Sequence, residues 1–421
     1  MPTRQYFYEC VPHGAGQEEN MQYDFTSIMD RHGKDAIAVD MLGKGWTPDA
    51  PKDGFDAIPM WVADMNFPTC PTIPQAIIQR TQHMAYGYFE PRAEYYDSII
   101  RWHEKRNGVT GLDKSCIGYE NGVLGGVASA LAACALPGDA ILLHSPTYIG
   151  FTGTLMNAGY RIVHSPLRLD ENGVWRMDFV DMDRKLKEHH IHAAIFCSPF
   201  NPCGRVWERW ELEQAMEVYR QNDCTVISDE IWSDIILDGH RHIPTQSVSE
   251  DAKQRTVAIY APSKTFNLAG LVGSYHIIYN KTLRDRVRAA GEKSHYNTMN
   301  VLSMYALIGA YQPEGYEWVD QLCHTLTQNV DYACGFIAEH FSGVQVAKPE
   351  GTYMLFLDCA EYCRTKGISI DQLQKAGWDV GVAWQDGRPF GGDYTIRMNL
   401  ALPLSRVQEA FRRLKEYVFE C

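Results

Sequence analysis

Short apolar runs alternate with helical patterns from about Ser115 to Asn280, and this alternation constrains the fold more than any other feature. The apolar runs are "CIGYE", "AILLHS", "RIVHS", "AAIFCS", "TVISDE", "TVAIYA" and "LVGSYHIIY". Helical patterns such as "VLGGVASALAACAL" and "ERWELEQAMEVYRQN" lie between them. Strands that alternate with helices form a mostly parallel sheet that is covered on both faces. The sequence therefore predicts an α/β domain of this kind.

Polar clusters follow four of the apolar runs. "SPTY" follows "AILLH", "SPFNPCG" follows "AAIFC", "SDE" follows "CTVI", and "APSK" follows "TVAIY". In parallel sheets of this type, ligands bind outside the carboxyl ends of the strands. Four polar clusters at such ends therefore indicate one binding site.

The pattern changes after Leu283, where helical stretches dominate the next part of the chain. Short strands such as "TYMLFLD" and "YTIRMNLA" then mix with helices, which is typical of a smaller α+β domain. At roughly 100–200 residues per domain, a chain of 421 residues is expected to contain two domains. We predict a large domain over 60–295, a small domain over 21–59 and 296–421, and an N-terminal arm over 1–20.

The charge and cysteine patterns argue against several classes of protein. The net charge is −13 and the basic residues are scattered, so no nucleic-acid partner is expected. The N-terminus lacks the apolar core of a signal peptide, and the apolar run Gly122 to Leu136 is shorter than the ~20 residues of a membrane span. The cysteines form no CxxC pair and no HExxH pattern occurs, so we expect reduced thiols, no metal site and a cytoplasmic location. Cys197 and Cys203 are interpreted as packing residues.

Lys264 lies in "APSK", directly after the apolar run "TVAIY". A lysine in a partly dry pocket at the end of a strand loses some of its preference for the charged form. A neutral amine can attack a carbonyl carbon and hold it as a Schiff base. A surface lysine that caps a loop is the alternative, and the neighbouring motifs favour the Schiff base.

These motifs supply groups that complement a pyridine ring with a phosphate. Asp229, buried at the end of a strand, needs a cationic partner, and a protonated pyridine nitrogen held by it becomes an electron sink. Asn201 in "NPCG" offers an amide donor to a phenolic oxygen, and Tyr148 offers a flat face for stacking. The turn "ENGVLGG" precedes a helix, so its N–H groups can hold a phosphate, to which Ser263 can add a hydroxyl. Pyridoxal phosphate requires this set of groups.

The order GVxxG…SPxY…NPxG…DE…SK…R resembles fold-type I pyridoxal-phosphate enzymes of the class I/II aminotransferase superfamily, over most of the chain. Within that superfamily, "RHGKDAIAVD", "MWVADMNFPTCPTIPQAI", "SKTFNLAGL" and "FGGDYTIRMNLALP" resemble the MalY/PatB-like cystathionine β-lyase (C–S lyase) branch. The resemblance implies a three-layer α/β/α large domain with a mostly parallel seven-stranded sheet, plus a smaller α+β domain.

The resemblance also implies roles for individual residues. Lys264 matches the lysine that forms the Schiff base and moves the proton, and Arg397 in "IRMN" matches the arginine that binds the substrate carboxylate. Tyr88 in "YGY" matches a tyrosine that reaches the cofactor phosphate of the neighbouring subunit, which implies a homodimer with shared active sites. The other residues that match cofactor contacts are Val123, Leu124, Tyr148, Asn201, Asp229, Trp232 and Ser263. By the same resemblance Asp64 and Asn66 border the substrate pocket, or else they form a helix-entry turn.

Three positions depart from the pattern of this superfamily. Trp232 stands where relatives carry Tyr or His near the ring oxygen, and its indole N–H donates but cannot accept. Ala261 stands where a phosphate-binding Ser is common, so Ser263 or a backbone group has to compensate. Val272 stands where many aminotransferases place a phosphate-binding Arg, and the absence of that Arg favours the lyase branch.

Three functions are compatible with these residues. The resemblance implies a lyase that cleaves an L-amino acid thioether such as L-cystathionine to a thiol, pyruvate and ammonia. The alternative is an aminotransferase, which shares the first proton removal and passes the amino group to a 2-oxo acid. A third function is a cofactor-bound regulator, which the combination of Lys264, Asp229 and Arg397 disfavours.

Overall fold

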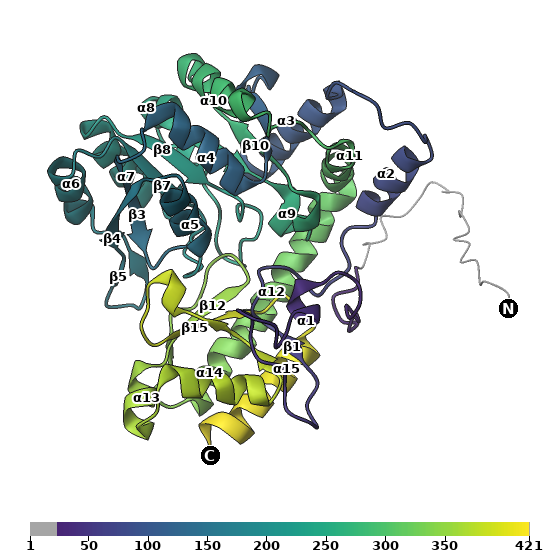
Figure 1. Ribbon diagram of the computed structural model, residues 1–421, viewed down its shortest axis with the longest axis vertical. Helices are drawn as coiled ribbons and strands as arrows, with labels where there is room; N and C mark the ends of the chain where they lie inside the picture. The colour runs from purple at the N-terminus through teal and green to yellow at the C-terminus, as the bar shows by residue number, and fades with distance from the viewer. Residues whose placement is uncertain (1–22, 421) are drawn as a thin grey trace.

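The structure is a computed structural model that describes residues 23–420 (Figure 1). The predicted N-terminal arm, 1–20, lies outside these residues. Two groups of elements are visible in Figure 1, one around a large sheet and one around a smaller sheet.

The large sheet has seven strands in the order β2–β10–β9–β8–β7–β3–β4. Only β10 runs opposite to the other six strands, which confirms the predicted mostly parallel sheet. The strands are β2 (Ile117–Asn121), β3 (Ala140–Ser145), β4 (Arg161–Pro166), β7 (Ala193–Cys197), β8 (Thr225–Asp229), β9 (Thr256–Tyr260) and β10 (Gly273–Ile277). Each lies, to within one residue, in one of the apolar runs read from the sequence. The central strands are buried along nearly their whole length because helices cover both faces.

The helices around this sheet begin where the sequence pattern becomes amphipathic or small and apolar. They are α4 (Val123–Cys134), α5 (Ile149–Asn157), α6 (Phe179–Glu188), α7 (Arg209–Gln221), α8 (Glu250–Arg255) and α10 (Lys281–Ser294). The short helix α9 (Pro262–Thr265) follows β9 and contains Lys264. Two helices, α2 (Thr72–Thr81) and α3 (Ala93–Asn107), lie in a stretch for which the sequence analysis predicts no element. A small hairpin, β5 (Arg168–Leu169) with β6 (Trp175–Arg176), lies beside β4.

The second group of elements surrounds a four-stranded antiparallel sheet, in the order β11–β12–β15–β14. Near the N-terminus, α1 (Ile37–Asp40) is followed by β1 (Ile58–Pro59), which pairs with β13 (Val382–Ala383) and so ties that stretch to this group. The strands are β11 (Gln345–Val346), β12 (Met354–Asp358), β14 (Gln385–Asp386) and β15 (Thr395–Asn399). The helices are α12 (Pro313–His340), α13 (Ala360–Lys366), α14 (Ile370–Asp379) and α15 (Leu404–Leu414), whereas α11 (Val301–Ala310) packs on α2, α3 and β10.

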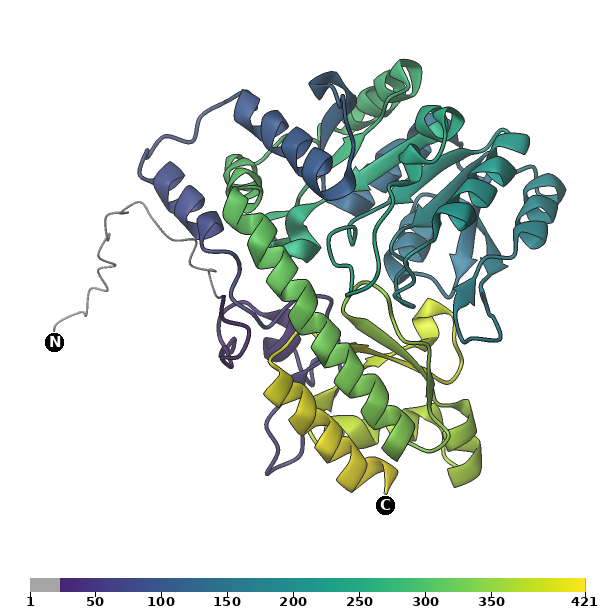
Figure 2. The same ribbon diagram turned by 180° about the vertical axis from the view of Figure 1, so that it is seen from behind.

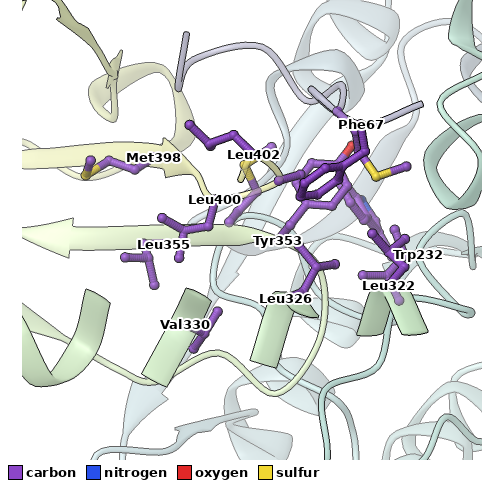
Figure 3. Close-up of a cluster of buried hydrophobic side chains, with 14 of the residues drawn as sticks. Phe67, Trp232, Leu322, Leu326, Val330, Tyr353, Leu355, Met398, Leu400 and Leu402 are labelled. Atoms are coloured by element: carbon purple, nitrogen blue, oxygen red, sulfur yellow. The ribbon is translucent and has the colours of Figure 1, made fainter. Parts of the chain in front are cut away.

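The long helix α12 joins the two groups, as Figure 2 shows from behind. Its apolar face packs under β12 and β15, and Figure 3 shows Leu322, Leu326 and Val330 beside Tyr353 and Leu400. We propose that the predicted domains correspond to the two groups. Helix α11 lies across the proposed boundary, because the Thr72 hydroxyl of α2 donates to the carbonyl of Gly309 (2.7 Å).

No helix within residues 23–420 is long and apolar enough to cross a membrane. Over the same residues, no cluster of His, Cys, Asp and Glu side chains is arranged to hold a metal ion.

Candidate active site

A pocket of about 330 Å³ lies at the carboxyl ends of the central strands. It is where the polar clusters of the sequence converge, because parallel strands end at the same edge of a sheet. Eight of the predicted site residues line it: Val123, Leu124, Tyr148, Asn201, Asp229, Trp232, Ser263 and Lys264. The structure therefore brings most of the predicted set together, and the role of each residue stays a prediction.

Lys264 is half-buried and lines the pocket. Its Nζ donates to the carbonyl of Ala63 (2.7 Å) and lies 5.6 Å from the ring centre of Trp232. Burial lowers the pKa of Lys264 to about 8, and the guanidinium of Arg397 acts in the same direction, against Asp64 and Asp229. A sizeable fraction of this amine is therefore neutral near pH 7–8, which suits both attack on a carbonyl and proton transfer.

Asp229 ends β8 and is only 4% exposed. Its Oδ1 accepts one hydrogen bond, from the N–H of Ile231 (3.0 Å), and the carboxyl forms no ion pair with Lys264 or any other described cation. Burial raises the pKa of Asp229 to about 7. The pocket thus contains a buried carboxyl that needs a positive partner, as a protonated ring nitrogen would be.

Arg397 lies on β15 and is 4% exposed; it does not line the pocket itself but bonds to Asn201, which does. Its Nη1 donates to Asn201 Oδ1 (3.2 Å), and its Nη2 donates to the carbonyl of Trp61 (3.2 Å) and to the side chain of Gln385. No described carboxylate pairs with it, its Nε has no partner, and burial lowers its pKa to about 10. A buried guanidinium without an acidic partner is suited to bind a carboxylate from outside the chain.

The hydrogen bond from Arg397 also fixes the amide of Asn201. Because Oδ1 accepts from the guanidinium, the Nδ2 group is the end that is left to donate into the pocket. Trp232 is 2% exposed and lines the same pocket, and its indole N–H has no acceptor among residues 23–420. Tyr353 packs edge-on against its ring at 4.7 Å (Figure 3). Two N–H donors are thus available to an oxygen atom of a ligand.

The turn before α4 forms one end of the pocket. Gly122 is the N-cap residue with φ 84°, a left-handed conformation that favours glycine. The N–H groups of Val123, Leu124 and Gly125 belong to the first turn of the helix, where no intrahelical acceptor exists. These donors, with the nearby Ser263, suit a phosphate.

Tyr148 is the N-cap residue of α5, and it lines the pocket from the end of β3. Burial raises the pKa of its phenol, so the ring stays neutral and available for stacking. The residues present therefore fit pyridoxal phosphate: an amine, an acid for the ring nitrogen, donors for the ring oxygen, an aromatic face and a phosphate turn.

Some predicted residues lie elsewhere. Tyr88 is fully exposed and does not line the pocket of its own chain, so its predicted contact with a neighbouring subunit is untested. Asp64 pairs with Arg31 (2.6 Å), while Asn66 accepts from the same arginine (3.0 Å). Ala261 and Val272, two of the positions that depart from the superfamily pattern, line the pocket as their places in the sequence indicate.

Several contacts of the pocket are not predicted from the sequence. Cys197 was interpreted as a packing residue; it is buried at the end of β7 beside Asp229 and also lines the pocket, whereas Cys203 is buried away from it. The carbonyls of Ala63 and Trp61 accept from Lys264 and Arg397, and they come from a stretch for which no helix or strand is predicted. The only available signal was the family resemblance of "WVADMNF".

This pocket at the strand ends of a mostly parallel sheet, with its amine, acid and phosphate turn, defines a class of α/β enzyme that works with a ring-and-phosphate cofactor. Residues 58–414 match the family described as aminotransferase class I and II, and the chain belongs to this family.

Within this family, the chain is similar to several relatives and solved structures that carry a more specific name. The chain is 33% identical over 363 residues to cystathionine β-lyase PatB of Bacillus subtilis, covering 86% of this chain and 92% of the relative. The PLP-bound C–S lyase from Staphylococcus hominis has a TM-score of 0.84 at 29% identity, covering 93% of this chain and 98% of that one. Cystalysin from Treponema denticola, whose structure contains pyridoxal 5′-phosphate, has a TM-score of 0.87 at 27% identity, covering 95% and 100%.

Proposed function

We propose that this chain is a pyridoxal-phosphate-dependent carbon–sulfur β-lyase. It cleaves an L-amino acid thioether of the cystathionine type to a thiol, pyruvate and ammonia. Its cofactor is pyridoxal 5′-phosphate, the molecule that the solved structures of similar proteins contain. The single observation that best supports the proposal is the unpaired trio of Lys264, Asp229 and Arg397 around one site, each side chain with its pKa shifted by burial.

The cofactor is held by residues that are already in place. In the proposed complex Asp229 would bind the ring nitrogen, Asn201 and Trp232 would donate to the ring oxygen, Tyr148 would stack on the ring, and the turn before α4 would hold the phosphate. When bound, pyridoxal phosphate supplies an aldehyde that joins an amine and a ring that accepts the electron pair left on Cα.

Arg397 fixes the orientation of the substrate. Its guanidinium binds the α-carboxylate, and the carbonyl of Trp61 and the side chain of Gln385 hold it in position. Arg397 also donates to Asn201. The residue that binds the substrate carboxylate and the residue that donates to the ring oxygen of the cofactor are therefore held in position by each other. This arrangement selects an α-amino acid.

Lys264 removes the proton from Cα of the bound substrate. A pKa of about 8 leaves the amine able to accept that proton near neutral pH and to return it later. The carbonyl of Ala63 accepts from the protonated amine, and the face of Trp232 favours its positive charge. The electron pair left at Cα then expels the β-thiolate as the Cβ–S bond breaks, the thiolate takes up a proton to become the thiol, and water hydrolyses the released three-carbon unit to pyruvate and ammonia.

An aminotransferase is the alternative, since the same residues remove the same proton. Val272 supports the lyase, because it leaves the phosphate end without the arginine that many aminotransferases carry there. The test is incubation with L-cystathionine in the absence of any 2-oxo acid. Equal amounts of homocysteine, pyruvate and ammonia are expected from the lyase, and Lys264→Ala is the inactive control. Turnover that requires an added 2-oxo acid would overturn the proposal.

We also propose a homodimer in which Tyr88 reaches the cofactor phosphate of the other subunit. Tyr88 is fully exposed and lies near other exposed apolar side chains, including Met84, Tyr86 and Phe89. The test mixes the variants Tyr88→Ala and Lys264→Ala under exchange conditions. Shared active sites predict recovered activity, because one site of a mixed dimer has both native residues. No recovery despite exchange would contradict shared sites.

A further inference from the structure

The phosphate end of the pocket has no dedicated cation. Among the described residues that line the pocket, Lys264 is the only lysine or arginine, and its proposed role is at the aldehyde. The phosphate must then be bound by backbone N–H groups, which are effective only when they are held in fixed directions. Whatever holds the turn before α4 therefore affects cofactor affinity.

Glu120, the residue just before this turn, is a buried anchor. It is 1% exposed, and a buried carboxylate needs strong donors. Its Oε1 bonds to Nδ1 of His276 (2.7 Å), and its Oε2 accepts from the hydroxyl of Tyr296 (2.9 Å) and from Nδ2 of Asn297 (2.8 Å). Burial and the nearby Glu120 raise the pKa of Tyr296, so its hydroxyl keeps the proton that it donates.

Tyr296 and Asn297, called the strap from here on, also touch the turn itself. Oδ1 of Asn297 accepts from the N–H of Asn121 (3.2 Å), at the start of the turn. At its other end, the ring of Tyr296 lies against Gly125, where an added methyl would be 2.4 Å from the Tyr296 oxygen. The strap thus contacts both sides of the three free N–H groups of Val123, Leu124 and Gly125.

We propose that the strap, anchored on Glu120, holds these N–H groups in the direction that binds the cofactor phosphate. Tyr296, Asn297 and Glu120 are positioning residues, since none of them lines the pocket and each acts through the turn. The inference rests on the proposed function, because it concerns the phosphate of that cofactor.

The test compares pyridoxal phosphate with pyridoxal, which lacks the phosphate. Dissociation constants of both are measured by titration of the cofactor-free, full-length protein and of Tyr296→Phe, which keeps the ring over Gly125 and removes the hydrogen bond to Glu120. Pyridoxal phosphate is expected to bind Tyr296→Phe about 10-fold more weakly, the loss expected for one hydrogen bond to a charged group. Pyridoxal is expected to bind both proteins equally.

Tyr362→Phe is the matched control, because it also removes one buried phenol hydrogen bond, to the carbonyl of Val418 (2.8 Å), far along the chain from the turn. Its affinity for pyridoxal phosphate is expected to stay unchanged. Asn297→Ala removes the other half of the strap and is expected to show the same phosphate-specific loss, which keeps the test decisive if Tyr296→Phe does not fold.

Two results would overturn the inference: unchanged affinity of both strap variants for pyridoxal phosphate, or an equal loss for pyridoxal phosphate and pyridoxal. Failure of the proposed function is distinguishable, because the unmodified protein would then bind pyridoxal phosphate but release no thiol, pyruvate and ammonia from L-cystathionine without an added 2-oxo acid.

Discussion

Asp229 and Glu230 follow one another at the end of β8, and both side chains are buried. Their surroundings nevertheless shift the pKa values of the two carboxyl groups in opposite directions. Burial raises the pKa of Asp229 to about 7, and the one hydrogen bond that its side chain accepts, from a backbone N–H, is too little to offset this. Burial would also raise the pKa of Glu230, but hydrogen bonds lower it overall. The groups that bond to Glu230 are the side chains of Ser228, His242 and Tyr260 and the N–H of Thr245.

The same contrast separates two buried arginines. Arg205 is 3% exposed and pairs with Glu208, Glu211 and Glu350, whereas Arg397 has no acidic partner. An unpaired charge in a dry interior is costly, so a fold retains one where a ligand supplies the missing partner. Asp229 and Arg397 belong to the proposed site, and Glu230 and Arg205 stabilise the chain around it.

The largest expected effect is that of Asp229→Asn on activity. The amide cannot hold a ring nitrogen in its charged form, so turnover should fall by about 10³-fold, or about 4 kcal/mol. The cofactor-free variant should unfold at the same temperature as the unmodified protein or higher, because a costly buried acid is gone. Steady-state kinetics and thermal unfolding check both parts. Activity within 10-fold of the unmodified protein would remove Asp229 from the mechanism.

The contribution of Asp229 to the stability of the cofactor-free protein should fall as the pH rises from about 4 to about 7. The pKa of Asp229 lies above its unfolded value of 3.8, so the folded state binds a proton that the unfolded state has lost, and stability falls as pH rises. Each pH unit contributes at most about 1.4 kcal/mol. The measurement is the difference in unfolding free energy between the unmodified protein and Asp229→Asn, which cancels the buried histidines. A difference that does not change with pH would contradict the raised pKa.

Glu230→Gln should destabilise the chain by about 3 kcal/mol, because it disrupts a buried, fully hydrogen-bonded carboxylate. The fraction of Glu230→Gln protein that remains folded should retain the visible absorption of bound cofactor, since Glu230 does not line the pocket. Denaturant unfolding measures the first effect and absorption spectra the second. Loss of cofactor absorption without loss of stability would erase the distinction between the two acids.

Arg397→Lys should raise KM for the amino-acid substrate by roughly 10- to 100-fold, since an ammonium cannot form the two parallel hydrogen bonds of a guanidinium. Arg205→Lys is the paired comparison, and its expected effect is lower stability with KM unchanged. Kinetics at several substrate concentrations and thermal unfolding separate the two. A higher KM in Arg205→Lys alone would reverse the roles assigned to the two arginines.

The sequence was sufficient to predict the large sheet and the groups at its strand ends. Lys264, Asp229 and Asn201 could be placed together because parallel strands end at one edge, whatever the intervening helices do. The contact of Lys264 with Ala63 spans 201 residues, and that of Tyr296 with Glu120 spans 176. No local periodicity encodes such pairs, because they depend on how loops pack once the sheet has formed.

Helices α2 and α3 show a second limit. Helix α2 has few buried positions, and α3 carries its buried Tyr95, Ile99 and Trp102 among many charged residues, so their apolar pattern is weak in the sequence. Cys197 shows a third, since a buried strand residue looks the same in sequence whether it faces packed side chains or a pocket.

The most direct test of the assigned site is reduction of the cofactor-loaded protein with borohydride, which makes the bond between a lysine amine and an aldehyde permanent, followed by peptide mass mapping. The expected result is the mass of the reduced cofactor on the peptide that contains Lys264, with no other lysine modified in proportion to the lost visible absorption. Modification of a different lysine in that proportion, with Lys264 recovered intact, would contradict the assignment.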